Sequence, residues 1–136
     1  MTLVDTNVIL DLATNDAIWV EWSRAQLDAA AARGPLFVSD IVFAEICVGF
    51  SEMVEVEALL RSMDVHIAPT PRAALFLAAK AYELYKKRGG GRSSILPDFF
   101  IGAHAAVLGR PLLTRDVRRY RTNFPGVRLI DPSSSP

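Results

Sequence analysis

The sequence predicts an α/β protein with a mainly parallel sheet. Short apolar runs of strand character alternate with longer segments of helical spacing, which is the pattern of strands joined by crossover helices. The chain has 136 residues, 51% of them hydrophobic, and this is material for one core. We therefore expect a single domain over residues 1–131, followed by a disordered Pro/Ser tail over residues 132–136.

The first half of the chain is expected to supply three strands and four helices. A short apolar strand over residues 2–5 leads into a helix, because Val8, Ile9 and Leu12 share one helical face. The remaining elements of this half are a helix from Ile18 to the stop signal Gly34-Pro35, a strand at 36–38, a helix at 41–50 capped by Ser39 or Asp40, a helix at 53–63 and a strand at 65–68.

The second half is expected to supply two helices and two strands. Pro71 suits a first helical turn, because its missing N–H would be unsatisfied there in any case. The helix that it opens runs from Ala73 to Tyr85, and its basic end is followed by three glycines. The remaining elements are a helix from Pro97-Asp98 to about Leu108, stopped by Gly109-Arg110-Pro111, and strands at 112–113 and 127–130.

Several functional classes are excluded by simple sequence features. The start of the chain lacks the basic region of a secretory signal, and Glu45 and His104 interrupt the two longest apolar runs, so we expect no membrane span and a cytoplasmic protein. The lone Cys47 cannot form an internal disulfide or a zinc site, and we interpret it as a buried apolar residue rather than a catalytic thiol. His66 and His104 are interpreted as structural or surface residues.

The formal net charge is zero, but the charges are unevenly distributed. Residues 1–64 hold eleven acidic and three basic residues, net −8, whereas residues 65–136 hold four acidic and twelve basic residues, net +8. Eleven of the fifteen basic residues lie between Lys80 and Arg128. The neutrality is a cancellation, and it does not exclude a polyanionic partner.

Four acidic residues occupy positions where reactive groups are expected. Asp5, Asp98 and Asp116 lie at strand ends or helix starts, where capping of a helix is the alternative interpretation. Glu45 lies inside an apolar helical run, where a carboxylate is costly to bury unless a distant arginine or a metal ion compensates it. Converging carboxylates select a hard cation, Mg²⁺ or Mn²⁺, which activates water for attack on a phosphodiester.

Four runs of residues carry a resemblance to a known family. They are Leu3–Leu10 (LVDTNVIL), Phe43–Ile46 (FAEI), Pro97–Ala105 (PDFFIGAHA) and Leu112–Asp116 (LLTRD). Together they resemble the PIN-domain ribonucleases, and most of all the VapC-type toxins of prokaryotic type II toxin–antitoxin systems. The resemblance covers essentially the whole chain, and it implies a three-layer α/β/α sandwich.

The resemblance also implies roles for individual residues. Asp5 and Asp98 would be the principal ligands of a Mg²⁺ ion, which Mn²⁺ can replace, and Asp116 would bind the ion directly or through water. Glu45 would position the attacking water or a second ion, which makes these four acids the expected catalytic residues. The expected supporting residues are Thr6, Thr114 and Asn7, for which helix capping is the alternative.

Basic residues near these acids predict contacts with RNA. Arginines around Asp116 suit phosphates, and Tyr120 among them offers a ring for stacking. For the segment over residues 86–94 the alternative is a flexible turn with a solvated face, and it lacks the ending of a nucleotide-binding loop. The predicted RNA-binding residues are Arg92, Arg115, Arg118, Arg119 and Tyr120.

Our leading hypothesis is a Mg²⁺-dependent endoribonuclease that acts as the toxin of a toxin–antitoxin pair. The alternative is a catalytically inactive protein of the same fold that binds RNA or protein. A phosphatase with Asp5 as nucleophile fits poorly, because no lysine follows Lys87. By the resemblance, the expected partners are an RNA substrate, a small VapB-type antitoxin whose arginine would compete for the carboxylates, and a second copy of the chain in a homodimer.

Overall fold

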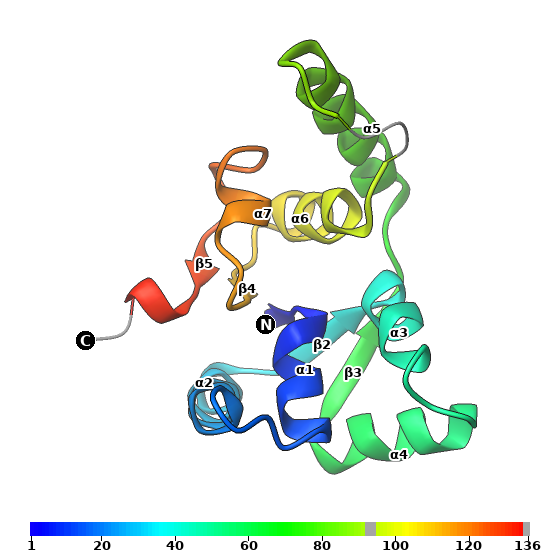
Figure 1. Ribbon diagram of the computed structural model, residues 1–136, viewed down its shortest axis with the longest axis vertical. Helices are drawn as coiled ribbons and strands as arrows, with labels where there is room; N and C mark the ends of the chain where they lie inside the picture. Colours follow the sequence, from blue (N-terminus) through cyan, green and yellow to red (C-terminus); the bar gives the residue numbers. More distant parts are fainter. Residues whose placement is uncertain (92–94, 135–136) are drawn as a thin grey trace.

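A five-stranded sheet forms the middle layer of the protein, whose computed structural model describes residues 1–91 and 95–134 (Figure 1). In spatial order the strands are β3 (Val65–Ala68), β2 (Leu36–Ser39), β1 (Thr2–Val4), β4 (Leu112–Leu113) and β5 (Leu129–Ile130). All four strand pairings are parallel, which confirms the predicted mainly parallel sheet. Leu3 of the central strand pairs with Phe37 on one side and with Leu112 on the other.

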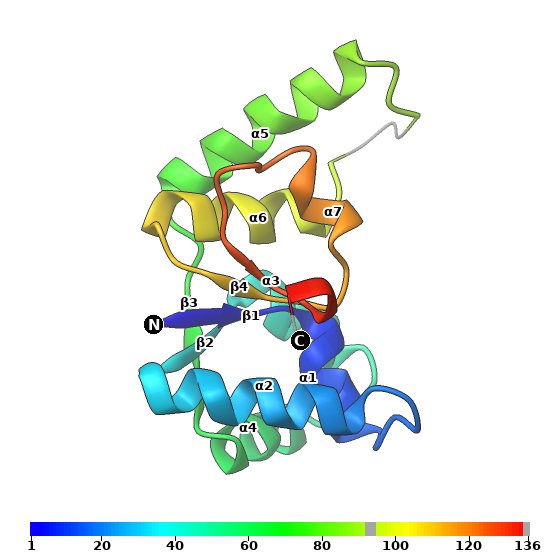
Figure 2. The same cartoon turned by 90° about the vertical axis from the view of Figure 1, so that its left-hand side faces the viewer.

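Helices cover both faces of the sheet and confirm the expected three-layer α/β/α sandwich (Figure 2). One face carries α1 (Thr6–Ala13), α2 (Val20–Arg33) and α4 (Met53–Ser62). The other face carries α6 (Pro97–Leu108) and the short α7 (Arg118–Arg121), with α5 (Arg72–Lys87) packed on the outside of α6. The remaining helix, α3 (Asp40–Cys47), contacts both α1 and α6.

Local sequence signals set several helix boundaries. Ser39 caps α3, because its hydroxyl accepts a hydrogen bond from the Val42 N–H at 3.0 Å. Pro97 begins α6 and places Asp98 in the first turn, where the helix dipole favours a carboxylate. Gly109 ends this helix in the left-handed conformation (φ 62°), which glycine adopts without a steric penalty. These signals act as the sequence predicts.

Two hydrophobic clusters hold the layers together. The larger one surrounds the sheet and includes Val4 of β1 and Ile101 of α6. The smaller one lies between α5 and α6 and includes Phe99 and Phe124. A Cβ atom at Gly102 would lie 2.4 Å from the Phe124 ring, so α6 needs a glycine at this point of contact. The position of α5 depends on this second cluster.

The structure departs from the sequence-based expectations in four places, one of which is the strand predicted over 127–130, where β5 covers only Leu129–Ile130. The sequence predicts no helix where α7 lies, because four residues are too few to display a helical period. The helix predicted over 41–50 ends at Cys47, and Gly49 follows in a turn. A 3-10 helix over Pro132–Ser134 replaces the start of the predicted disordered tail, whereas residues 135 and 136 lie outside the described residues.

Several side chains are less buried than their spacing predicts. Met53, in the first turn of α4, is 64% exposed, and Cys47, predicted to be buried, is half-buried beside the larger cluster. The two histidines differ, since His104 is buried in α6 whereas His66 is exposed. Within residues 1–91 and 95–134 no helix has both the length and the apolar character needed to cross a membrane.

The strand order creates a topological switch point beside β1. From β1 the chain continues to β2 and β3 on one side of the sheet, and it later returns to β4 and β5 on the other side. In open parallel sheets, ligands bind beyond the carboxyl ends of the strands at such a point. The segments that leave β1 and β4 there begin with Asp5 and Thr114.

Candidate active site

Asp5 directly follows β1 at the switch point and is 1% exposed. Its Oδ1 accepts a hydrogen bond from the Thr6 backbone N–H at 2.8 Å, which also caps α1. Its Oδ2 accepts hydrogen bonds from the hydroxyls of Thr114 at 2.8 Å and Tyr120 at 2.7 Å, and the Asn7 amide lies 3.5 Å away. These donors come from α1, the β4 loop and α7, so three elements fix the orientation of one carboxylate.

Asp98 lies within electrostatic reach of both Asp5 and Asp116. Burial raises the pKa of Asp98 above its ordinary value. The hydrogen bond from the Asp98 backbone N–H and the positive charge of Arg119 oppose this rise. The negative charges of Asp5 and Asp116 add to the rise. Asp116 itself pairs with Arg119, with 2.9 Å between Oδ2 and Nε. The structure therefore gathers three of the four predicted acids around one arginine.

Glu45 reaches this group through Thr6. The Thr6 hydroxyl donates to Oε1 of Glu45 at 2.6 Å, while the Thr6 backbone N–H donates to Asp5. One residue thus connects the acid on α3 with the acid after β1. The sequence predicts that a distant arginine or a metal ion is needed to stabilise the charge of Glu45. Because Glu45 is only half-buried, solvent and the Thr6 hydroxyl supply much of that stabilisation instead.

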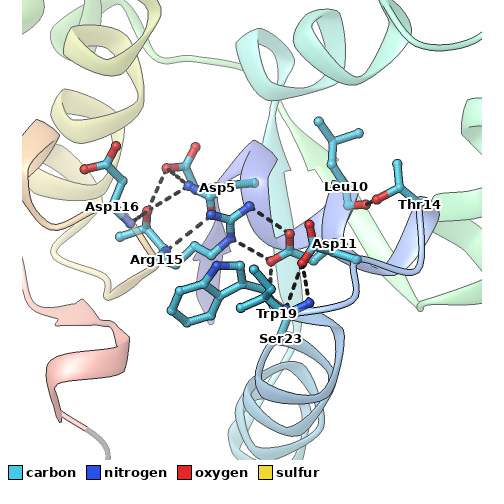
Figure 3. Close-up of polar contacts among 12 residues, drawn as sticks. Asp5, Leu10, Asp11, Thr14, Trp19, Ser23, Arg115 and Asp116 are labelled. Atoms are coloured by element: carbon cyan, nitrogen blue, oxygen red, sulfur yellow. Dashed lines mark hydrogen bonds and ion pairs between the residues drawn. The ribbon is translucent and has the colours of Figure 1, made fainter.

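The segment after β4 is anchored by a cluster that we call the Arg115 clamp, made of Arg115, Asp11, Ser23 and Trp19 (Figure 3). Arg115 forms a bidentate ion pair with Asp11, at 2.8 Å from Nε to Oδ2 and 2.9 Å from Nη2 to Oδ1. Asp11 is 2% exposed and also accepts a hydrogen bond from the Ser23 hydroxyl at 2.7 Å. The Arg115 guanidinium lies 5.3 Å from the centre of the Trp19 ring.

The backbone beside the clamp is fixed as well. Asn7 lies one turn before Asp11 on α1, and its Oδ1 accepts a hydrogen bond from the Arg115 N–H at 3.3 Å. The Thr114 hydroxyl donates to Asp5 and accepts from the Asp116 N–H at 3.0 Å. Thr114 and Asn7, two predicted supporting residues, therefore connect the segment that carries Asp116 to Asp5 and α1.

The structure corrects two of the predicted RNA contacts. Arg115 is engaged by a buried carboxylate, and the hydrogen bonds with Asp11 raise the pKa of its guanidinium, so the Nε–Nη2 edge of this group is not available to phosphate. Tyr120 is fully buried and cannot present its ring to a base. Burial and the negative charge of Asp5 raise the pKa of Tyr120 far above its usual value, which keeps the hydroxyl protonated as a donor.

The other predicted RNA contacts lie on α7 or outside the described residues. Arg118 and Arg119 are both exposed. Burial alone would lower the pKa of Arg119, but the nearby carboxylates of Asp116 and Asp5 outweigh it and raise the pKa. Both arginines stay predicted contacts, and Arg92 belongs to the residues that the structure does not describe.

The group of acids around Asp5 offers oxygen ligands of the kind that a hydrated Mg²⁺ or Mn²⁺ ion prefers. Among residues 1–91 and 95–134, no three acidic, histidine or cysteine side chains lie close enough to enclose an ion by themselves. Mg²⁺ does not need such a cage, because it keeps several waters and binds through one or two carboxylates plus substrate phosphates. The predicted ligands are Asp5 and its acidic neighbours, and none of them is a cysteine or a histidine. They therefore fit a Mg²⁺ or Mn²⁺ ion that keeps part of its water shell.

Residues 2–125 match the PIN domain family. The chain belongs to this family. The matched span of this PIN domain contains all four predicted acids and ends before β5. Among curated proteins, no relative matches the chain.

Solved structures similar to this PIN domain include chains of VapBC complexes and a VapC toxin. A chain of the Rickettsia felis VapBC2 complex, bound to a promoter DNA fragment, has a TM-score of 0.74 at 16% identity and covers 96% of this chain and 97% of its own. A chain of DNA-bound VapBC from Salmonella typhimurium has a TM-score of 0.71 at 18% identity, with 96% of both chains covered. VapC20 of Mycobacterium tuberculosis, a sarcin–ricin loop cleaving toxin, has a TM-score of 0.63 at 18% identity over 94% of this chain and 99% of its own. At these identities the likeness establishes the fold.

Sequence reasoning missed two residues of this site. Asp11 is a buried carboxylate among apolar helical neighbours, so the argument that singles out Glu45 applies to it equally. Tyr120 was assigned to RNA rather than to Asp5, and no local pattern indicates otherwise, because the two residues are 115 positions apart.

Proposed function

We propose that this PIN domain is a metal-dependent endoribonuclease that acts as the toxin of a toxin–antitoxin pair, with residues 1–131 as its single domain. The observation that carries the proposal is the orientation of Asp5 by three hydrogen bonds at the switch point, next to Asp98 and Asp116. Clustered carboxylates repel each other, and such a group is stabilised by a divalent cation. The likeness to VapBC chains and to VapC20 supports the same reading.

Each residue of the site has a role in this mechanism. Asp5, Asp98 and Asp116 would hold Mg²⁺, or Mn²⁺ in its place, directly or through water. When bound, the ion would lower the pKa of an attacking water and neutralise charge on the phosphate. Glu45 would orient the attacking water, and Thr6, which donates to both Glu45 and Asp5, fixes the positions of the two carboxylates relative to each other.

Cleavage of an RNA pool by the purified protein in Mg²⁺ tests the proposal. We expect cleavage by the wild type, none in EDTA, and a loss on the order of a hundredfold or more in Asp5→Ala and Asp98→Asn. Asp64→Asn is the matched control, because Asp64 lies before β3 with a side chain that is 96% exposed. Equal activity of the wild type and both site variants would refute the site assignment.

An inactive RNA-binding protein of the same fold is the competing function. The described residues hold no closed three-ligand metal cage, and this is the observation that favours it. It predicts that RNA binding is unaffected by EDTA and that no RNA is cleaved. Mg²⁺ titration by calorimetry separates the two, since only the nuclease requires binding that Asp98→Asn weakens.

The toxin role predicts effects in cells. Expression of the chain should arrest bacterial growth, Asp5→Ala should not, and coexpression of a cognate VapB-type antitoxin should restore growth. Sequencing the RNA ends produced after brief expression identifies the cleaved RNA. Loss of viability with both wild type and Asp5→Ala would contradict a catalytic toxin.

A homodimer is the proposed assembly. Large apolar side chains are exposed on α4, where Met53 and Val54 are each 64% exposed, and on α5, where Phe76 is 65% exposed. Such surfaces are costly to leave in water and are typical of protein interfaces. Sedimentation equilibrium tests the assembly, and Val54→Lys should shift a dimer toward monomer.

A further inference from the structure

A basic hollow lies beside the acidic site, on the other side of α7. Its volume is about 330 Å³, and the end of α5 and the segment from α7 onward form its walls. The lining includes Arg88 and Arg118 together with the polar Thr122 and Asn123, and it contains no acidic residue. In a chain of zero net charge, a concave surface with two guanidinium groups and no carboxylate attracts anions.

The wall of this basic hollow is anchored to the helix that carries Asp98. A Cβ atom at Gly90 would lie 2.4 Å from the Tyr85 ring, so only glycine allows the chain to pack on that ring. Tyr85 in turn packs edge-on against Phe99, with 5.5 Å between ring centres. Phe99 directly follows Asp98, and the hollow is therefore held in place relative to the acids.

The short helix α7 separates the basic hollow from the acids. Arg118 lines the hollow, whereas Arg119 pairs with Asp116 at 2.9 Å, because successive helical residues point in different directions. Figure 2 shows α7, the start of α6 and the end of α5 on one side of the molecule, at the carboxyl ends of the strands. A strand of RNA that lies on the acids can continue over α7 into the hollow.

We propose that the basic hollow binds the RNA strand that flanks the cleaved bond. Arg88 and Arg118 contact backbone phosphates, and Thr122 and Asn123 contact ribose or base groups. This inference rests on the proposed nuclease function and names the place outside the acids where the substrate is held. The hollow contributes to RNA affinity rather than to bond cleavage, because its lining holds no acid.

The chain provides a matched control for this basic hollow. A smaller hollow of about 220 Å³ is lined by Arg110 and Arg128. These residues precede β4 and β5, so they lie at the opposite edge of the sheet from the acids. All four arginines are exposed, and replacing them by glutamine leaves the core unchanged.

Binding of a fluorescent single-stranded RNA, measured by anisotropy in EDTA at several salt concentrations, tests the proposal. Each phosphate contact on a single strand contributes about 0.7 to the slope of log K against log salt. We expect Arg88→Gln/Arg118→Gln to weaken binding and reduce that slope by about 1.4. Arg110→Gln/Arg128→Gln should change neither. Equal effects of the two double variants would overturn the proposal.

Cleavage kinetics distinguish failure of this inference from failure of the nuclease function. Arg88→Gln/Arg118→Gln should raise KM far more than it lowers kcat, whereas Asp98→Asn should lower kcat. A wild type that cleaves RNA, with the Arg88/Arg118 variant equal to the Arg110/Arg128 control, overturns the basic hollow alone. A wild type that binds RNA through Arg88 and Arg118 but never cleaves it overturns the nuclease function alone.

Discussion

Replacing Arg115 by methionine removes the cation of the Arg115 clamp and leaves Asp11 buried without it. Both oxygens of Asp11 bond to the guanidinium, at 2.8 and 2.9 Å, and after the substitution the hydroxyl of Ser23 is the hydrogen-bond donor that remains in the clamp. With only 2% of Asp11 exposed, water cannot solvate the carboxylate in the native geometry. Methionine keeps an unbranched apolar stem beside Trp19, so the change isolates the loss of charge and hydrogen bonds.

The expected loss of stability follows from the burial of the pair. Removing one partner of a buried ion pair costs about 3–5 kcal/mol. The Arg115 side chain is 29% exposed, so solvent screening places the loss at the lower end, near 3 kcal/mol. For a domain of this size, at roughly 3–5 °C per kcal/mol, Tm falls on the order of 10–15 °C.

Urea unfolding of Arg115→Met and of the double variant Arg115→Met/Asp11→Leu measures this loss. An apolar pair often replaces a buried ion pair without loss, so the double variant should regain most of the stability. The segment after β4 still lacks its ion pair with Asp11 of α1, so Mg²⁺ affinity by calorimetry should stay reduced. A loss below about 1 kcal/mol in the single variant, typical of surface pairs, would refute the reasoning, as would a double variant no more stable than the single one.

Three further substitutions test other parts of the structure. Burial lowers the pKa of His104 below its ordinary value of 6.5, so the unfolded chain takes up a proton at a higher pH than the folded protein. The free energy of unfolding of the wild type should therefore fall as the pH drops from 6.5 through the lowered pKa. Urea unfolding between about pH 7.5 and about pH 5 should show this loss in the wild type and not in His104→Leu. Tyr120→Phe removes a 2.7 Å hydrogen bond to Asp5, so stability should fall by about 1.5–3 kcal/mol and Mg²⁺ affinity should weaken in calorimetry, and an unchanged affinity would contradict a positioning role. Gly102→Ala places a methyl group 2.4 Å from the Phe124 ring, so thermal unfolding should show a loss of about 1–3 kcal/mol, whereas an unchanged Tm would mean that the ring moves freely.

Most of the fold is predictable because its signals are local. Pro71 and the three glycines that follow Arg88 bracket α5, and the stop at Gly109 separates α6 from β4. The errors occur where local signals are weak. A helix as short as α7 shows no helical period in the sequence. Its position is determined by Tyr120, which packs into the larger cluster without any sequence pattern that indicates its burial.

The places of the four acids in the fold are predictable for the same reason, since each lies at a strand end or in a helix with a recognisable start. Their partners are not, because the hydrogen bonds that orient Asp5 come from residues 109 and 115 positions away. Residue type alone assigns Tyr120 to RNA, whereas burial assigns it to Asp5.

The clamp also changes the meaning of the charge balance. Arg115 belongs to the basic half of the chain, and it is used inside the protein by Asp11 of the acidic half, so part of the cancellation to zero is an internal ion pair. The guanidinium edge that pairs with Asp11 is not available to a polyanion. The charge that remains available to RNA near the acids therefore includes the exposed arginines of α7 and, across it, Arg88. A salt dependence of RNA binding that the double variant Arg115→Met/Asp11→Leu alters as much as Arg118→Gln would contradict this division between internal and substrate-facing arginines.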